Sequence, residues 1–192
     1  EIGFEKENLL LINRSDLLKE RIDAFKEQIE QNANVIVAAN ANSIPSTEYS
    51  DNAHWLEGWN RDEIFTLASS RVSYDFDQAM GLEMVSGRFF SRDMPSDSSG
   101  VVINEAAVSA LGLEEPLNNR FMEPGEDGEE DQFSPIIGVV KDYHFASLQS
   151  EIAPMAMHFM PGNYEGYITI RLGNGNQAET LTFLENTWNE FI

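Results

Sequence analysis

The stretch from Pro135 to Pro154 constrains the fold most, because it passes from a buried type of strand directly into a polar corner. Its first residues, Ile136–Val140, are isoleucine and valine except for Gly138, a composition typical of a strand in a sheet core. The corner that follows carries a cation, an anion, a phenol and an imidazole: Lys141, Asp142, Tyr143 and His144. This corner is therefore the first candidate binding site of the chain.

The polar corner admits two interpretations. One is a site for proton transfer or metal binding, since a carboxylate and an imidazole lie two residues apart. The other is a structural strand end, in which Asp142 accepts hydrogen bonds from turn amides while Tyr143 and Phe145 pack. The sequence nearby has no nucleophile, second base or glycine-rich anion loop, which favours the structural interpretation. A metal-dependent hydrolase around Asp142 and His144 is the least favoured alternative.

The first 45 residues predict a strand, a helix and a second strand in close succession. Leu9–Ile12 and Val35–Ala39 are buried types of strand. Between them, Ser15 is expected to cap an amphipathic helix whose apolar residues follow the helical spacing: Leu18, Ile22, Phe25 and Ile29. This order indicates a βαβ-type unit and an α+β fold class.

Further elements follow along the chain. Strands are predicted at residues 64–74, 82–85, 101–103, 155–160 and 167–172, and short helices follow Asp75 and Asn104. The last helix places four apolar side chains on one face: Leu181, Leu184, Trp188 and Phe191. We expect this face to pack against the strands at 167–172 and 9–12, with both chain ends in one lobe and facing one surface.

Two tryptophans lie in the polar, turn-rich segment 40–60. Trp55 and Trp59 are four residues apart, with His54 beside them, so they can form a platform for a small molecule or a peptide. They can equally anchor a long loop to the body of the protein, and we favour this second role. A binding module that uses Trp55 and Trp59 stays the main alternative function.

The net charge of −21 excludes some partners. A chain this acidic is repelled by nucleic-acid phosphates and by anionic lipid headgroups. It is compatible with cationic ligands or basic proteins, or with adaptation to high salt, and the even spread of the acids favours the last slightly.

No pattern of a metal, cofactor or catalytic site is present. The chain has no cysteine, and His54, His144 and His158 lie in separate segments without zinc-site spacing. The acidic run at residues 123–131 lacks the EF-hand order of ligands, which favours a solvated loop over a calcium site. No stretch reaches the roughly 18 apolar residues of a membrane span. We therefore expect no catalytic residues, no cofactor and no metal.

Several segments resemble the periplasmic core domain of MacB-like, FtsX-type ABC transporter permeases. The resemblance covers nearly the whole chain and rests on these segments: LEMVSGRFFS at 82–91, GVVINEAAVSALGL at 100–113, GVVKD at 138–142 with Ile152 and Pro154 behind it, and the order of residues 7–45. PLNNRF at 116–121 stands where many members have a glycine turn, and the acidic loop after it has no counterpart. These motifs are structural, so they specify a type of domain better than a substrate.

The resemblance implies a porter-like subdomain at residues 1–86 plus 164–192, with an inserted, mostly β lobe at 87–163. It implies a periplasmic domain of an inner-membrane protein that relays ATP-driven motion to partners outside the membrane, a role called mechanotransmission. The implied partners are the protein's own membrane helices, a cytoplasmic ABC ATPase, a periplasmic adaptor or lipoprotein substrate, and a second copy or pseudo-copy. Gly87 and Gly162, near the two crossings between lobes, are the hinge candidates.

Overall fold

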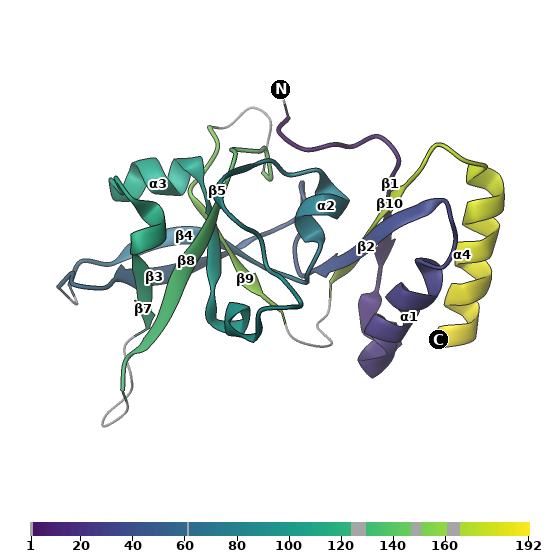
Figure 1. Cartoon of the computed structure of the whole chain (residues 1–192), viewed down its shortest axis with the longest axis horizontal. Coiled ribbons are helices and arrows are strands. Elements are labelled where there is room, and N and C mark those ends of the chain that lie inside the picture. Colours follow the sequence, from purple (N-terminus) through teal and green to yellow (C-terminus); the bar gives the residue numbers. More distant parts are fainter. Residues whose placement is uncertain (1, 61, 124–129, 147–150, 161–165) are drawn as a thin grey trace.

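The computed structural model describes residues 2–60, 62–123, 130–146, 151–160 and 166–192, and it shows an α+β fold (Figure 1). Its helices are α1 (Ile22–Ile29), α2 (Phe76–Met80), α3 (Glu105–Leu111) and α4 (Gln177–Phe191). Its strands are β1 (Leu9–Asn13), β2 (Val35–Ala41), β3 (Ser50–Leu56), β4 (Phe65–Val72), β5 (Met84–Gly87), β6 (Val101–Asn104), β7 (Arg120–Glu123), β8 (Gln132–Val140), β9 (Met155–Phe159) and β10 (Tyr167–Leu172).

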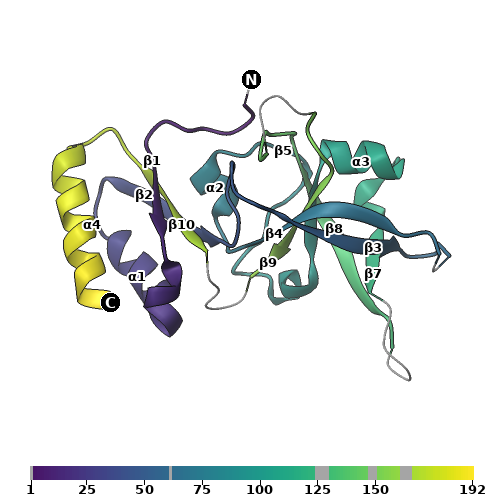
Figure 2. The same ribbon diagram turned by 180° about the vertical axis from the view of Figure 1, so that it is seen from behind.

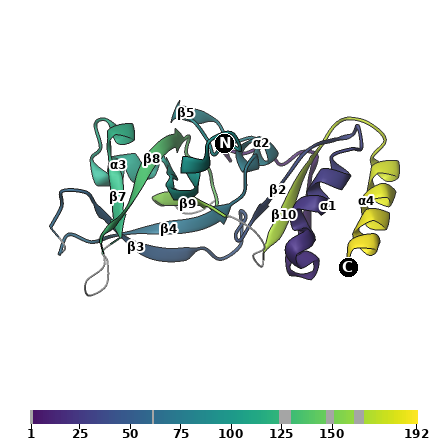
Figure 3. The ribbon, with the colours of Figure 1, turned by 60° about the horizontal axis from the view of Figure 1, so that its bottom comes forward.

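At one end of the molecule, β1, β10 and β2 form a small sheet that α1 and α4 cover on one face (Figures 1 and 3). We call these five elements the helix–sheet unit. Both β1 and β2 run antiparallel to the central β10, so they are parallel to each other and are connected through α1. The four side chains predicted to form the buried helix face are at most 1% exposed, which confirms that face: Leu18, Ile22, Phe25 and Ile29.

The structure corrects the expected start of the first helix. Residues Ser15–Arg21 form a 3₁₀ turn that is interrupted at Lys19, where φ is 51°, and α1 begins only at Ile22. Ser15 does not cap this turn, because Arg14 occupies the N-cap position. The last helix packs on β10 through Leu184, which lies in one apolar cluster with Ile168 and Ile170, and Trp188 and Phe191 are partly buried against that cluster. Leu181, predicted on the same face, is 41% exposed, so the prediction is wrong for this residue.

At the other end, six strands close into a ring in the order β4, β3, β7, β8, β6 and β9, with β9 pairing back to β4 (Figure 2). We call this ring the barrel. Its interior holds an apolar cluster, with Leu67, Ile103 and Phe121 among its members, and α3 contributes Ala107 and Leu111 to that cluster. Side chains of α3 therefore complete the apolar core of the barrel.

The strand pairing differs from the expected grouping in two respects. β3 and β4 precede the expected boundary at residues 86 and 87, yet they pair with β7 and β9, which lie beyond it. β5 spans that boundary and pairs with β8, which lies beyond it. Both differences arise because long-range pairing across the barrel, rather than sequence proximity, decides the neighbours of a strand.

The two units share a continuous apolar core. β2 and β4 pair at one position only, Ala41 opposite Val72. Around this position, Val37 and Ala39 of β2 lie in one buried cluster with Phe76 of α2 and Val140 of β8. A core that extends across both units resists their relative motion, because opening it would expose apolar surface to water.

The two ends of the described chain do not lie together. The N-terminus lies above the middle of the molecule and the C-terminus lies at the lower edge of the helix layer (Figure 1). The expectation that both would face one surface is therefore wrong for this structure. Within the described residues, no helix is both long and apolar enough to cross a membrane.

Candidate functional site

The polar corner after β8 holds three parts of the fold together. The Asp142 carboxylate accepts a hydrogen bond of 2.9 Å from the backbone N–H of Ala106, in the first turn of α3. In return, the Asp142 backbone N–H donates to the Glu105 carboxylate at 3.1 Å. Asn104 caps the same helix by accepting from the Ala107 N–H, as the sequence predicts. Asp142 therefore binds the start of α3, where a negative charge is favoured.

The neighbours of Asp142 also have structural partners. Tyr143 is 1% exposed, its hydroxyl donates to the sulfur of Met155, and burial raises the pKa of its phenol above the usual range. The backbone N–H of His144 donates to the Ile2 carbonyl. Lys141 pairs with the exposed Glu83 carboxylate at 3.1 Å. These contacts favour the structural interpretation of the corner over a catalytic one.

The role of Asp142 can be tested by mutation. Asp142→Ala is expected to lower the free energy of unfolding by about 1 kcal/mol, since it removes an acceptor for a helix N-terminal N–H. Asp142→Asn keeps an acceptor oxygen and should lose less than half of that. Denaturant unfolding of the two variants and the wild type measures both values. A loss of less than about 0.3 kcal/mol for Asp142→Ala would contradict the structural role.

Arg171 joins the N-terminal segment to both units. It is 6% exposed on β10, and its guanidinium donates to three backbone carbonyls: those of Ala79 at 3.0 Å, Glu5 at 2.7 Å and Glu7. Ala79 belongs to α2, which packs between the helix–sheet unit and the barrel. One buried cation therefore fixes α2 and residues 5–7 to the sheet, although burial lowers the pKa of the guanidinium.

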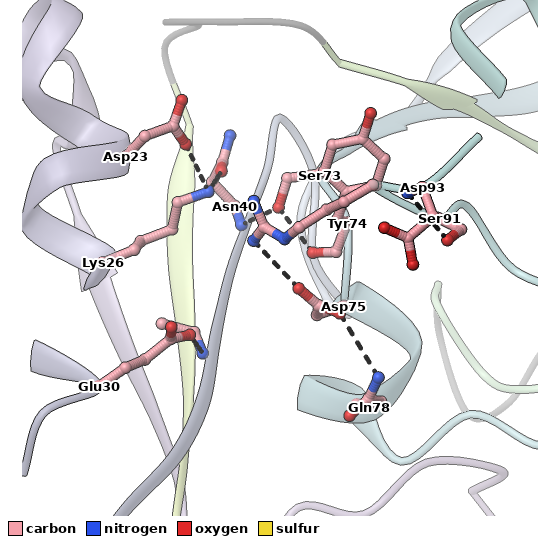
Figure 4. A network of polar contacts seen from close by, with 12 residues as sticks. Asp23, Lys26, Glu30, Asn40, Ser73, Tyr74, Asp75, Gln78, Ser91 and Asp93 are labelled. Carbon is pink, nitrogen blue, oxygen red and sulfur yellow. Dashed lines mark hydrogen bonds and ion pairs between the residues drawn. The ribbon is translucent and has the colours of Figure 1, made fainter. Parts of the chain in front are cut away.

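A second polar network runs from α1 to the chain after β4 (Figure 4). The ammonium of Lys26 is buried and donates to the Asn40 side chain at 2.7 Å, while it pairs with Asp23 at 2.9 Å. The Asn40 backbone N–H donates to the Ser73 hydroxyl, and the Ser73 backbone N–H donates to the Asn40 carbonyl. This network and Arg171 lie where the two units meet, and we call them, together with the shared apolar core, the junction.

Of the two hinge candidates, the structure describes Gly87 but not Gly162. Gly87 has a φ of 67°, and a Cβ there would lie 2.3 Å from the Ile137 carbonyl oxygen, so packing against β8 requires glycine. The next residue, Arg88, forms a two-pronged ion pair with the buried Asp97 carboxylate and holds its pKa below the usual range. Gly87 thus lies inside the barrel packing, and β5 does not run between the two units. Gly162 lies outside the described residues.

The barrel has a polar cavity of about 1030 Å³, lined by residues of β3, β4, β7, β8 and β9 among others. Trp55 lines it, whereas Trp59 packs edge-on against Phe65 and is 38% exposed. The cavity floor holds two nearly parallel imidazoles, those of His54 and His158, with ring centres 5.6 Å apart. Sequence reasoning missed this pair, because strands far apart in the chain, β3 and β9, bring the two histidines together.

The histidine pair should make the barrel sensitive to acid. Burial lowers the pKa of both imidazoles to about 4, and at His158 the neighbouring His54 ring and Arg71 add to this effect. The folded state therefore binds fewer protons than the unfolded state between pH about 6.5 and about 4, so stability is lost as the pH falls through this window. The loss is on the order of 3 kcal/mol per histidine at most.

We expect His158→Phe to reduce this acid sensitivity. The free energy of unfolding should fall less between pH 7 and pH 4.5 in the variant than in the wild type, because one of the two buried imidazoles no longer takes up a proton. Urea unfolding of both proteins at the two pH values gives the comparison. An equal fall in both proteins would show that His158 does not titrate in this window.

The arrangement offers no metal centre among the described residues, where no group of three or more histidine, cysteine, aspartate or glutamate side chains converges. Most of the acidic run, residues 124–129, lies outside them, so the structure does not test the calcium alternative. What the described geometry provides is a well-packed junction between two units and a polar cavity in one of them.

The fold is that of the periplasmic domains of MacB-like transporters, as comparison with solved structures shows. The periplasmic region of MacB from Actinobacillus actinomycetemcomitans matches 98% of this chain and 85% of its own, with a TM-score of 0.66 and 15% identity. A domain of a protein described as a permease from Porphyromonas gingivalis matches 86% of this chain and 69% of its own (TM-score 0.60, 20% identity). The extracellular domain of the ABC-type transporter YknZ from Gram-positive bacteria matches 94% and 93% (TM-score 0.55, 11% identity).

No family model and no curated protein sequence matches the chain. The structural matches confirm the resemblance drawn from the sequence motifs, at the level of the fold.

Proposed function

We propose that this chain is a non-enzymatic, extracytoplasmic domain of an ABC transporter permease of the MacB and FtsX type. The observation that carries the proposal is the structural match, which extends over 98% of the chain to the periplasmic region of MacB. In this proposal the domain lies in the periplasm and belongs to an inner-membrane protein with a cytoplasmic ATPase partner. The helix–sheet unit corresponds to the porter-like part, and the barrel corresponds to the lobe inserted between β2 and β10.

The domain relays motion in this proposal and performs no chemistry. Motion of membrane helices, driven by ATP, would pass through the junction to the barrel. A relay of this kind requires a stiff junction, because a loose one would absorb the displacement. The shared apolar core, the three hydrogen bonds of Arg171 and the Lys26–Asn40–Ser73 network support this requirement.

The barrel is the part that would contact a partner outside the membrane, either a periplasmic adaptor or a lipoprotein substrate. A second copy of the permease, or a pseudo-copy, would complete the transporter. Asp142 and His144 have no role in catalysis here, because the Asp142 carboxylate is bound to the start of α3.

The proposal can be tested in the full-length protein with its ATPase in lipid nanodiscs. Val85 of β5 is 52% exposed on the barrel, so a spin label at this position in each copy reports the separation of the two barrels. The distance between labels should change when ATP is trapped, and it should stay constant with an ATPase variant that cannot bind ATP. No change on trapping ATP, or a full-length protein without an ATPase partner, would contradict the proposal.

A further inference from the structure

The inner edge of β3 is only partly paired. On one side, residues Ser50–His54 pair with β4 in regular antiparallel register. On the other side, β7 pairs with β3 only at Trp55 and Leu56. Among the described residues, the first half of β3 therefore has a neighbouring strand on one side only.

The hydrogen-bond pattern shows which backbone groups this edge presents. The N–H of Ala68 on β4 donates to the Pro154 carbonyl at 3.0 Å, on the side away from β3. Asp51 lies opposite Ala68, so this is a non-hydrogen-bonded pair, and the N–H and C=O of Asp51 point away from β4. By the period of two, those of Ala53 do the same.

The residues further along β3 support this alternation. Trp55 has the same parity and pairs with β7, and the N–H of Glu57 donates to the Arg120 carbonyl at 3.0 Å. Among the residues of β3 whose backbone groups point away from β4, Asp51 and Ala53 are therefore the two that do not pair with a described strand. They form a short, open template for another strand.

The open edge borders the polar cavity of the barrel. Ser50, Asn52 and His54 line the cavity from one face of β3. Ala53 and Trp55 also border it, although they lie on the opposite face together with Asp51, which does not line the cavity. Across the cavity, Gln132 and Ser134 of β8 form the facing wall. A volume of about 1030 Å³ is large for a small-molecule pocket, and it suffices for several residues of extended chain.

The charges around this edge select the occupant. Arg71 and Glu123 are the lining residues with a full charge, one of each sign, and the remaining polar ones are mainly serine, asparagine and glutamine. Side chains that point into the cavity should therefore be uncharged and polar. On the outer face, Asp51 is exposed, and the whole chain carries a charge of −21, so outward side chains should be basic.

We propose that the cavity and the open edge of β3 bind an extended, basic segment of a partner protein, which adds a strand beside the first half of β3, where β7 does not pair. The partner's backbone would hydrogen-bond to Asp51 and Ala53, its uncharged side chains would enter the cavity, and its lysines or arginines would face outward. Recognition of this kind takes affinity from the main chain and specificity from alternate side chains. The site does not depend on the relay function proposed above.

The test uses the isolated chain and an acetylated, amidated octapeptide of alternating threonine and lysine. In amide-resolved NMR at low salt, the signals of Asp51 and Ala53 should shift saturably with peptide. Their hydrogen exchange should slow by at least about tenfold at saturation. Two further peptides carry N-methyl groups on alternate residues, one on the odd-numbered and one on the even-numbered residues. The peptide whose methyl groups block the N–H groups that face β3 should bind at least about tenfold more weakly than the other.

A matched pair of variants tests the edge itself. Ala53→Pro removes the docking N–H without removing a bond to β4, since proline is tolerated on an open edge. It should weaken peptide binding by at least about tenfold, whereas Ala53→Val, which keeps the N–H, should change it by less than about twofold. Amide spectra that match the wild type outside β3 show that both variants are folded.

Three results would overturn this assignment. They are no saturable binding at millimolar peptide, binding that neither N-methylation nor Ala53→Pro affects, or binding of a neutral oligosaccharide in the cavity while the peptide does not bind. Because the experiment involves no nucleotide and no membrane, its failure would leave the relay proposal intact.

Discussion

Replacing Arg171 by methionine should lower the free energy of unfolding by about 3–5 kcal/mol. The substitution keeps most of the apolar stem but leaves the carbonyls of Glu5, Glu7 and Ala79 without their shared donor. Hydrogen bonds to a charged group contribute about 1.5–3 kcal/mol each, and water replaces part of that where the segment is accessible. Urea unfolding at pH 7 measures the loss.

Arg92→Met is the control for this prediction. The Arg92 side chain is 56% exposed and pairs with Asp75 at 3.1 Å on the surface, so its loss should cost less than about 1 kcal/mol. Equal effects of the two substitutions would mean that Arg171 does not hold the junction together.

Phe25→Ala should also cost about 3–5 kcal/mol, the usual range for removing a buried aromatic ring. Phe25 is fully buried between the small sheet and α4, with ring centres 5.6 Å from Trp188 and 5.5 Å from Phe191. Its removal leaves a cavity between α1 and α4 and takes away two edge-to-face ring contacts.

Leu181→Ala on the same helix layer is the comparison, because this side chain is 41% exposed and should lose less than about 1 kcal/mol. A Phe25→Ala variant as stable as Leu181→Ala would show that α1 and α4 are not packed through Phe25. Trp188, which the sequence places on the buried face of α4, is only partly buried, so its truncation should cost less than that of Phe25.

The sequence predicts helices and their buried faces well where one face of the element is apolar. The spacing of Leu18, Ile22, Phe25 and Ile29 predicts the buried side of α1 and of the 3₁₀ turn before it, and Asn104 and Gly112 mark the two ends of α3. These signals are local, so they do not depend on knowing which strands pair.

The same reasoning missed β3, and the physical reason is its polar inner face. Ser50, Asn52 and His54 point toward a cavity instead of an apolar core, so the strand lacks the apolar alternation that marks a half-buried strand. The approach of His54 to His158 and the bond from Asp142 to α3 depend on pairing between distant strands. Types of residue and their spacing do not carry that information.

The most direct test of the account measures whether the two units move as one body. The chain has no cysteine, so Ser109→Cys on α3 and Leu181→Cys on α4 give one spin label in the barrel region and one in the helix–sheet unit. In the full-length permease proposed above, together with its ATPase, the distance between these labels within one copy should keep a single narrow distribution with and without trapped ATP. A shift or a second distance on trapping ATP would show that the junction bends, and it would contradict the stiff relay.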